Sequence, residues 1–192
     1  MKDMVIEQMI VTSALRDRIV YLNEDTNRES MFKCAYLLDR IVSLDKQKHG
    51  YDENNLEPIE IRICSEGGVI YFGTMLLSKI MELKDMGYKI ITRTDGMAMS
   101  MGAMIFVLGD ERIIGRYATF MIHSPSAGTW GTLQDIADDV DETNRLWQLM
   151  KKIVIENTDV TDEQLEDLRY RRKDWYLGCD ECIKHKIATK IV

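Results

Sequence analysis

The stretch IEIRICSEGGVIYFGTMLLSKIMEL, residues 59–83, carries the pattern that decides the fold. Isoleucines alternate with more polar residues from Ile59 to Cys64, and this period of two predicts a half-buried strand. Gly67 and Gly68 then form a turn, after which apolar residues recur at helical spacing over Val69–Leu83. The stretch therefore predicts a strand, a glycine turn and a helix in direct succession.

The same order of elements recurs on both sides of this stretch. An apolar-periodic helix is predicted over Met31–Leu44, and a second strand over Tyr88–Thr92 runs through a glycine turn into a helix, Met99–Leu108. One or two more strands are predicted over Ile113–Ile122, and the polar window Asp45–Asn55 is predicted to be a surface loop. This alternation indicates an α/β fold with a parallel sheet, in which function resides at the carboxyl ends of the strands.

A long amphipathic helix is predicted over Leu133–Glu156. Its apolar face consists of Leu133, Ile136, Ala137, Val140, Leu146, Leu149, Met150 and Ile153. A helix of about 24 residues rises roughly 36 Å, which exceeds the diameter of a compact domain of this size. Part of the apolar face is therefore expected to pack on another subunit, and an internal core helix is the alternative.

Composition limits the class of protein. The chain has 192 residues, two prolines and no Gly/Ser-rich linker, so a single domain over residues 1–192 is expected. A net charge of −7 argues against general nucleic-acid binding. No apolar run reaches the ~18 residues of a membrane span, and four scattered cysteines do not form a disulfide framework. We therefore expect no nucleic acid, no membrane and a cytoplasmic location.

Three histidines are the candidates for a general base. His49 lies in the polar window, and His185 lies between two lysines and is expected to be solvated. His123 closes the apolar segment FMIH and precedes Ser-Pro, which puts an ionisable ring at the end of a strand. His123 is therefore the strongest candidate, although a structural histidine remains the alternative.

Ser100 is the candidate nucleophile, because it follows a glycine turn and opens a helix. The segment is close to a G-x-S-x-G elbow but has Ala98 at the first glycine position, so a small serine that eases helix packing remains the alternative. Asp174 is the candidate acid, since Arg171, Arg172 and Lys173 before it would favour its ionised form. Such a charged run can equally be a solvated face.

Two further motifs carry polar or metal-binding chemistry. The turn Ser65–Gly68 can direct backbone N–H groups outward, because glycines adopt positive φ, although an ordinary tight turn is the alternative. Cys179, Cys182 and His185 have spacings that invite a metal or redox interpretation. The same spacing puts both cysteines on one apolar helix face, and no fourth ligand is evident, so no metal is expected.

Four motifs taken together resemble the Clp protease proteolytic-subunit family. They are SEGGVI at 65–70, GMAMSMGA at 96–103, FMIHSP at 120–125 and KDWYL at 173–177, in the family's order and spacing. The resemblance runs from residue 17 to the end of the chain. It implies a crotonase-like fold, a repeated β-β-α spiral with a protruding handle helix at 133–156, and a Ser-His-Asp endopeptidase without a cofactor.

The resemblance also implies residue roles and partners. Ser100 would be the nucleophile, His123 the general base and Asp174 the orienting acid, while the backbone N–H groups of Gly68 and Met101 would form the oxyanion hole. Two stacked seven-membered rings would enclose a chamber that takes peptides and unfolded proteins. An ATP-dependent AAA+ unfoldase would feed it, and residues 1–16 would form a short N-terminal gate segment.

The chain departs from the family pattern at several places. Glu66 replaces a proline and would place a carboxylate near the substrate groove, disfavouring acidic peptides. Met99 replaces a small alanine, the loop around Asn54 is longer, and the N-terminal segment, where an unfoldase would dock, is shorter. The methionines at 97, 99, 101 and 104 are expected to form adaptable walls around the nucleophile.

Three other functions remain open at this stage. A non-catalytic ring subunit would have lost a residue of the triad, and a capsid-processing relative would differ only in its substrate. A crotonase-type acyl-CoA hydratase or isomerase would need a catalytic acid or base in place of Ser100. The intact triad favours a peptidase over the first and third of these alternatives.

Overall fold

A five-stranded parallel sheet forms the centre of the molecule in the computed structural model, which describes residues 2–49, 55–126 and 128–192. Its strands in spatial order are β1 (Ile19–Leu22), β2 (Ile59–Ile63), β3 (Ile90–Thr94), β5 (Glu111–Ile114) and β8 (Lys190–Ile191). Buried and partly exposed residues alternate along β2 and β3, as the period-two pattern of β2 requires. The α/β class and the parallel sheet are therefore confirmed.

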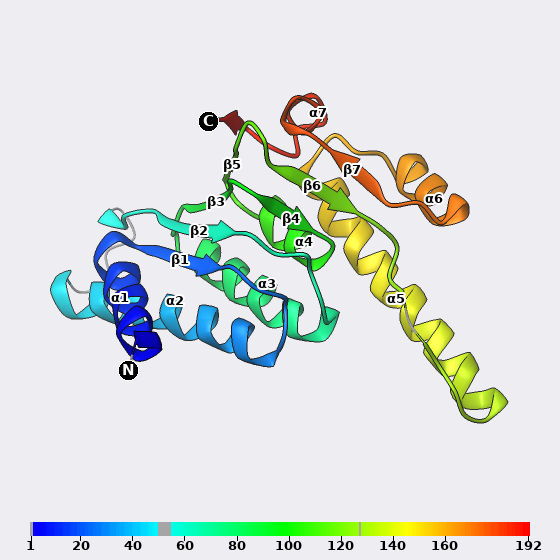
Figure 1. The fold of residues 1–192 in the computed structure, drawn as a ribbon, viewed down its shortest axis with the longest axis horizontal. Helices are drawn as coiled ribbons and strands as arrows, with labels where there is room; N and C mark the ends of the chain where they lie inside the picture. Colours follow the sequence, from blue (N-terminus) through cyan, green and yellow to red (C-terminus); the bar gives the residue numbers. More distant parts are fainter. Residues whose placement is uncertain (1, 50–54, 127) are drawn as a thin grey trace.

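A second, three-stranded sheet continues from the first. It contains β4 (Met97–Met99), β6 (Thr119–Ile122) and β7 (Trp175–Leu177), in the order β4-β6-β7. Strand β6 runs parallel to β4 and antiparallel to β7. This small sheet therefore brings together three segments that lie far apart in the sequence (Figure 1).

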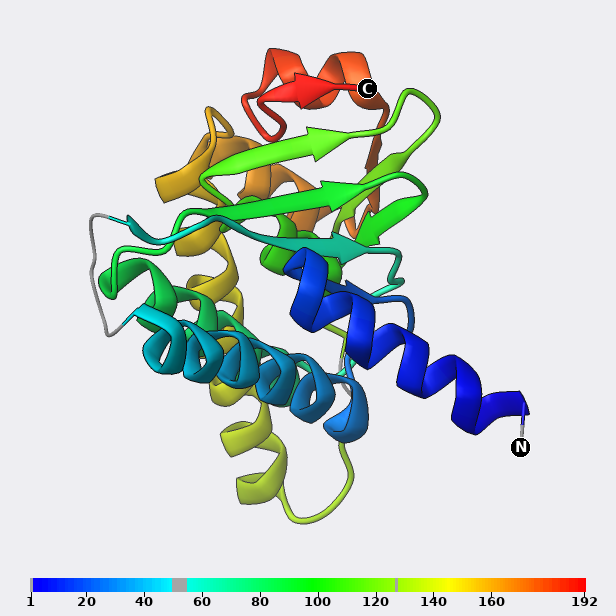
Figure 2. The same ribbon diagram turned by 90° about the vertical axis from the view of Figure 1, so that its left-hand side faces the viewer.

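Helices pack against these sheets. They are α1 (Lys2–Asp17), α2 (Arg28–His49), α3 (Ile70–Asp85), α4 (Met101–Val107), α5 (Leu133–Asn157), α6 (Asp162–Arg171) and α7 (Cys179–Lys184). Helices α2, α3 and α4 lie side by side on one face of the strands, and α4 is buried along its whole length (Figures 1 and 2). Among the described residues, no helix combines the length and the apolar character that crossing a bilayer requires.

Helix α2 continues beyond its expected end, so the surface loop predicted over Asp45–Asn55 is wrong in its first part. The helix reaches His49, and the Asp45 carboxylate accepts hydrogen bonds from Arg18 at 2.8 Å and from the Tyr88 hydroxyl at 2.9 Å. These bonds fix a further turn of helix on the body of the molecule. Residues 50–54, with the expected insertion around Asn54, lie outside the described residues.

Two other expected boundaries also change. The helix predicted over Met99–Leu108 begins at Met101, because residues 97–99 pair with β6 as strand β4. Residues 2–17 form helix α1, so the segment expected to act as a gate is helical, and its role as a gate stays a prediction.

Helix α5 projects beyond the rest of the molecule (Figures 1 and 2). Its buried residues all lie in its second half, from Leu146 to Val154, whereas Leu133 is 88% exposed and Val140 is 52% exposed. The second half is joined to α6 by Lys151, whose ammonium lies 2.6 Å from both Asp162 and Glu166. The expected apolar face is therefore covered by this chain only at the carboxyl end of the helix.

The core position of α3 leads to a stability prediction. We expect Leu76→Ala to lower the free energy of unfolding by about 2–5 kcal/mol, because Leu76 is fully buried and truncation leaves a cavity. The matched control is Met75→Ala at the next, exposed position, which should change it by less than about 1 kcal/mol. Urea unfolding followed by tryptophan fluorescence measures both, and equal losses would contradict this packing.

Candidate active site

Ser100 lies at a sharp turn between strand β4 and helix α4. Its backbone has φ 52° and ψ −117°, a conformation that is costly for a residue with a side chain. The turn is fixed because the Ser100 N–H donates to the Met121 carbonyl at 2.9 Å and the Met99 N–H donates to the Ser65 carbonyl at 3.0 Å. This strained turn is the arrangement expected of a nucleophile elbow.

His123 follows the last residue of β6, the strand that runs beside β4. The register pairs Met99 with Met121, so Ser100 and His123 extend from neighbouring strand ends. The His123 Nε2 atom lies 2.8 Å from the Ser100 Oγ atom, within hydrogen-bonding distance. This contact is the one a general base needs in order to take the hydroxyl proton.

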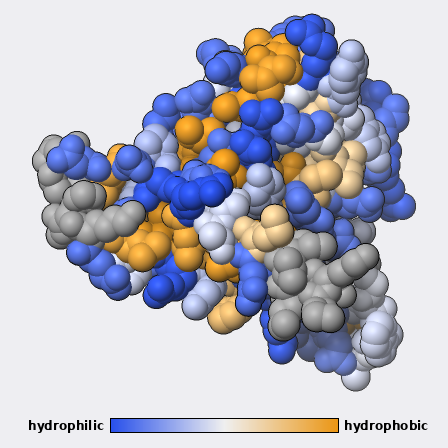
Figure 3. Space-filling view, turned by 60° about the vertical axis from the view of Figure 1, so that its left-hand side comes forward, coloured by the Kyte–Doolittle hydropathy of each residue, from blue (hydrophilic) through white to orange (hydrophobic). Residues whose placement is uncertain are grey.

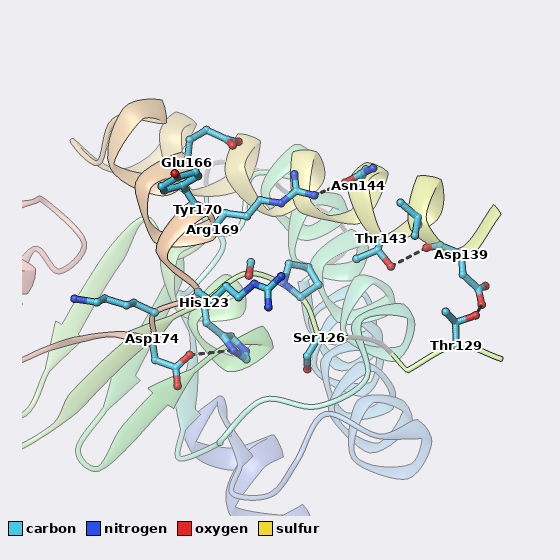
Figure 4. Close-up of a pocket in the computed structure, with 15 residues that line it drawn as sticks. His123, Ser126, Thr129, Asp139, Thr143, Asn144, Glu166, Arg169, Tyr170 and Asp174 are labelled. Carbon is cyan, nitrogen blue, oxygen red and sulfur yellow. Dashed lines mark hydrogen bonds and ion pairs between the residues drawn. The ribbon is translucent and has the colours of Figure 1, made fainter. Parts of the chain in front are cut away.

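Asp174 lies on the other side of His123, just before strand β7. Ile122 of β6 pairs with Trp175 of β7 in antiparallel register. His123, which follows Ile122, therefore lies opposite Asp174, which precedes Trp175. The His123 Nδ1 atom is 3.5 Å from the Asp174 Oδ1 atom, which is longer than a good hydrogen bond (Figure 4). The Asp174 side chain is also 49% exposed, so it is the least confined of the three.

The turn Ser65–Gly68 approaches Ser100 closely. Gly67 and Gly68 both have positive φ, 106° and 134°. A Cβ atom on Gly67 would lie 2.6 Å from the Ser100 Cβ and 3.0 Å from the Met101 nitrogen, so only glycine fits there. The Ser65 hydroxyl accepts the Gly67 N–H at 3.2 Å and helps to hold the turn.

Thr26 orients the N–H group of Gly68. Its N–H donates to the Gly67 carbonyl at 2.5 Å and its carbonyl accepts the Val69 N–H at 2.8 Å. In parallel pairing these bonds use the groups on either side of Gly68, so the Gly68 N–H faces away from Thr26. Met101 is the first residue of α4 and has no intrahelical acceptor for its N–H. The N–H groups of Gly68 and Met101, the two expected oxyanion donors, are therefore not used by the pairing with Thr26 or by the hydrogen bonds within α4. No signal in the sequence marked Thr26 as a residue of the site.

The other sequence candidates do not join this cluster. Cys182 is buried, which raises its pKa to about 12, and its thiol donates to the Leu177 carbonyl. His185 packs edge-on against Trp175, and His49 ends helix α2. Among the described residues no group of three His, Cys, Asp or Glu side chains could hold a metal ion.

The expected methionine walls are only partly present. Met101 and Met104 are fully buried within helix α4, where they belong to the core instead of lining a groove. Met101 packs beneath Gly73, where an added Cβ would lie 2.3 Å from its Cγ. Of these four methionines, only Met97 and Met99 are partly exposed and could contact a bound substrate.

Comparisons with known proteins identify the family to which the chain belongs. The family model described as Clp protease matches residues 3–192. A protein of Deinococcus radiodurans named ATP-dependent Clp protease proteolytic subunit is 27% identical over 185 residues, which cover 95% of this chain and 84% of that protein. The ATP-dependent Clp protease proteolytic subunit 2 of Chlamydia trachomatis matches with the same identity and coverage.

The close approach of Gly67 to Ser100 leads to a prediction. We expect Gly67→Ala to reduce the rate at which a fluorophosphonate probe labels Ser100 by roughly tenfold or more, because the added methyl group displaces the turn. Gly128→Ala is the matched control, since a Cβ there meets nothing within 4 Å. Intact-mass spectrometry measures the labelling, and equal rates in the two variants would contradict the geometry.

Proposed function

Because the chain belongs to the Clp protease family, we propose that it is a serine endopeptidase in which Ser100, His123 and Asp174 hydrolyse peptides and unfolded proteins. The observation that carries the proposal is the 2.8 Å distance between His123 Nε2 and Ser100 Oγ. A serine hydroxyl is a weak nucleophile by itself, and an adjacent imidazole removes its proton as it attacks.

The first half of the reaction forms an acyl-enzyme. His123 accepts the Ser100 proton as Oγ attacks the peptide carbonyl, and the N–H groups of Gly68 and Met101 stabilise the tetrahedral oxyanion. His123 then gives the proton to the leaving amine. Water deacylates the enzyme through the same steps, with His123 again acting as base.

Asp174 supports the imidazolium that forms in each half-reaction. Its Oδ1 atom needs to move less than 1 Å from its 3.5 Å position to accept a hydrogen bond from His123 Nδ1. Catalytic hydrogen bonds are often long in the absence of substrate and tighten in the reacting complex. The Asp174 position therefore supports an orienting role that substrate binding completes.

Self-assembly is the second part of the proposal. Members of the family form ring oligomers with ATPase partners. The uncovered half of α5 and the exposed aromatic residues Phe32 and Tyr36 on α2 support burial against further copies. Figure 3 shows apolar surface between hydrophilic groups on one face. We propose two stacked seven-membered rings, with docking of an AAA+ unfoldase and a cytoplasmic location as further expectations.

The alternatives have less support from the site. An acyl-CoA hydratase or isomerase would need an acid or base where Ser100 lies, and Ser100 instead contacts His123. A non-catalytic subunit would lack one of the three side chains. A capsid-processing peptidase would share the site, and peptides trapped by a Ser100→Ala protein would distinguish it.

Removal of the nucleophile tests the catalytic proposal. We expect Ser100→Ala to lower peptide turnover by about 10⁶-fold and Asp174→Asn by about 10⁴-fold, as in other serine proteases. Ser78→Ala, on the exposed face of α3, is the control that keeps wild-type turnover. A fluorogenic peptide assay measures the rates, and wild-type turnover in Ser100→Ala would rule out the mechanism.

Light scattering tests the assembly. We expect the wild-type protein to have a mass many times that of one 22.3 kDa chain. Leu133→Glu should lower that mass, because it puts a charge on the uncovered half of α5. Gln148→Glu, at an exposed polar position of the same helix, is the control. A wild-type monomer at micromolar concentration would contradict the chambered arrangement.

A further inference from the structure

The hydroxyl of Thr26 lies in the interior without a partner. Thr26 lies between β1 and α2 and is fully buried, and its Oγ1 atom makes no hydrogen bond to any described part of the chain. The buried hydroxyl of the nearby Ser30, in contrast, donates to the Asp25 carbonyl at 2.6 Å and accepts the Asn27 N–H at 3.0 Å. A buried hydroxyl without a partner costs free energy that a valine of the same shape would avoid, which indicates a specific role for it.

Thr26 packs directly against Gly68, one of the two proposed oxyanion donors. A Cβ atom on Gly68 would lie 2.9 Å from the Thr26 Oγ1 atom and 3.0 Å from the Thr26 nitrogen. The Thr26 N–H donates to the Gly67 carbonyl at 2.5 Å. The hydroxyl and the N–H of Thr26 therefore face the same part of the turn, and of these two groups only the N–H has a partner there.

The peptide between Gly67 and Gly68 is the part of the turn that can take two orientations. Rotation of a peptide plane with both Cα atoms in place changes ψ of the residue before it and φ of the residue after it. Both of these residues are glycines, so no Cβ atom opposes the rotation, and reversal of the plane would bring φ of Gly68 from 134° into the ordinary negative range. The bond from the Gly67 N–H to the Ser65 hydroxyl belongs to the preceding peptide and would remain.

The two orientations would differ in what they offer to a substrate. In the present orientation the Gly68 N–H faces away from Thr26 and is available to an oxyanion. In the reversed orientation this N–H would point to Thr26, where the hydroxyl is an acceptor without a partner, and the Gly67 carbonyl would point into the oxyanion site. A carbonyl oxygen repels a developing negative charge, so the reversed turn would not stabilise the transition state.

We propose that the Thr26 hydroxyl accepts the Gly68 N–H in this second orientation, so that residue 26 sets the fraction of molecules in which the oxyanion hole is formed. The proposal rests on the proposed peptidase function of the same site. Thr26 is a positioning residue, because it lies beneath the turn and acts through Gly68 without touching the substrate. Since Thr26 is fully buried within a single chain, its contacts do not depend on which surfaces other copies cover.

Thr26→Val tests the link to the reaction, because it removes the hydroxyl and keeps the shape of the side chain. We expect it to raise kcat for a fluorogenic peptide, and the rate at which a fluorophosphonate labels Ser100, by about two- to fivefold with KM unchanged, since the reversed turn loses its acceptor. Thr26→Ser keeps the hydroxyl and should keep the wild-type rates. Thr94→Val is the matched control. Thr94, at the end of β3, has the other buried hydroxyl without a partner among the described residues, and its removal should leave kcat unchanged.

Hydrogen exchange resolved to single amides by mass spectrometry tests the two orientations without catalysis. In Thr26→Val we expect the Gly68 N–H to exchange about two- to fivefold faster, because it loses its acceptor in the reversed turn. The N–H of residue 26 should exchange more slowly, because its bond to the Gly67 carbonyl persists. A general gain in stability would slow both amides. Unchanged exchange at both amides, or a change of the same sign at both, overturns the inference.

The two measurements separate this inference from the proposed function. If the wild-type protein neither hydrolyses peptides nor reacts with the probe, the proposed function fails, whereas opposite changes at the two amides still support the two orientations. If the wild-type protein is active and Thr26→Val has the wild-type kcat, the inference is overturned. It is also overturned if Thr94→Val gains as much activity as Thr26→Val.

Discussion

The pairing register of strand β6 is the constraint on which the candidate site depends. One edge of β6 pairs with β4 and the other with β7, so the residues that flank these strands, Ser100, His123 and Asp174, meet at one end of the small sheet. A slip of one residue on either edge would turn a side chain to the opposite face. The site is therefore determined by strand pairing and not by the loops themselves.

The strained backbone conformation of Ser100 is maintained because the packing around it leaves no room for another conformation. The Ser100 N–H is bonded to the Met121 carbonyl, and Gly67 packs directly on the turn. Residues 103–107 of α4 are fully buried, so the helix that follows cannot shift to relieve the strained conformation. The cost of the turn is thus offset by core packing, which keeps the hydroxyl oxygen within reach of His123.

The sequence predicted the repeating elements well, because their apolar periods are long and strong. It predicted β2, α3 and α5 to within a few residues, and the position of His123 at a strand end followed from the apolar segment before it. It could not separate β4 from α4, because a three-residue strand has too short a period and its partner lies more than 20 residues away. The continuation of α2 to His49 likewise depends on tertiary bonds from Arg18 and Tyr88 to Asp45.

The charges at the end of α6 were visible in the sequence, but their roles were not. The run from Arg171 to Lys173 can be read from the sequence as a solvated face, and the structure distinguishes its members: Arg171 pairs with Asp167, while Arg172 ends the helix and Lys173 leads into Asp174. The left-handed residue Arg172 produces this division, because it ends the helix and redirects the chain into Asp174 and β7. The same turn thus positions the candidate catalytic acid at the start of β7.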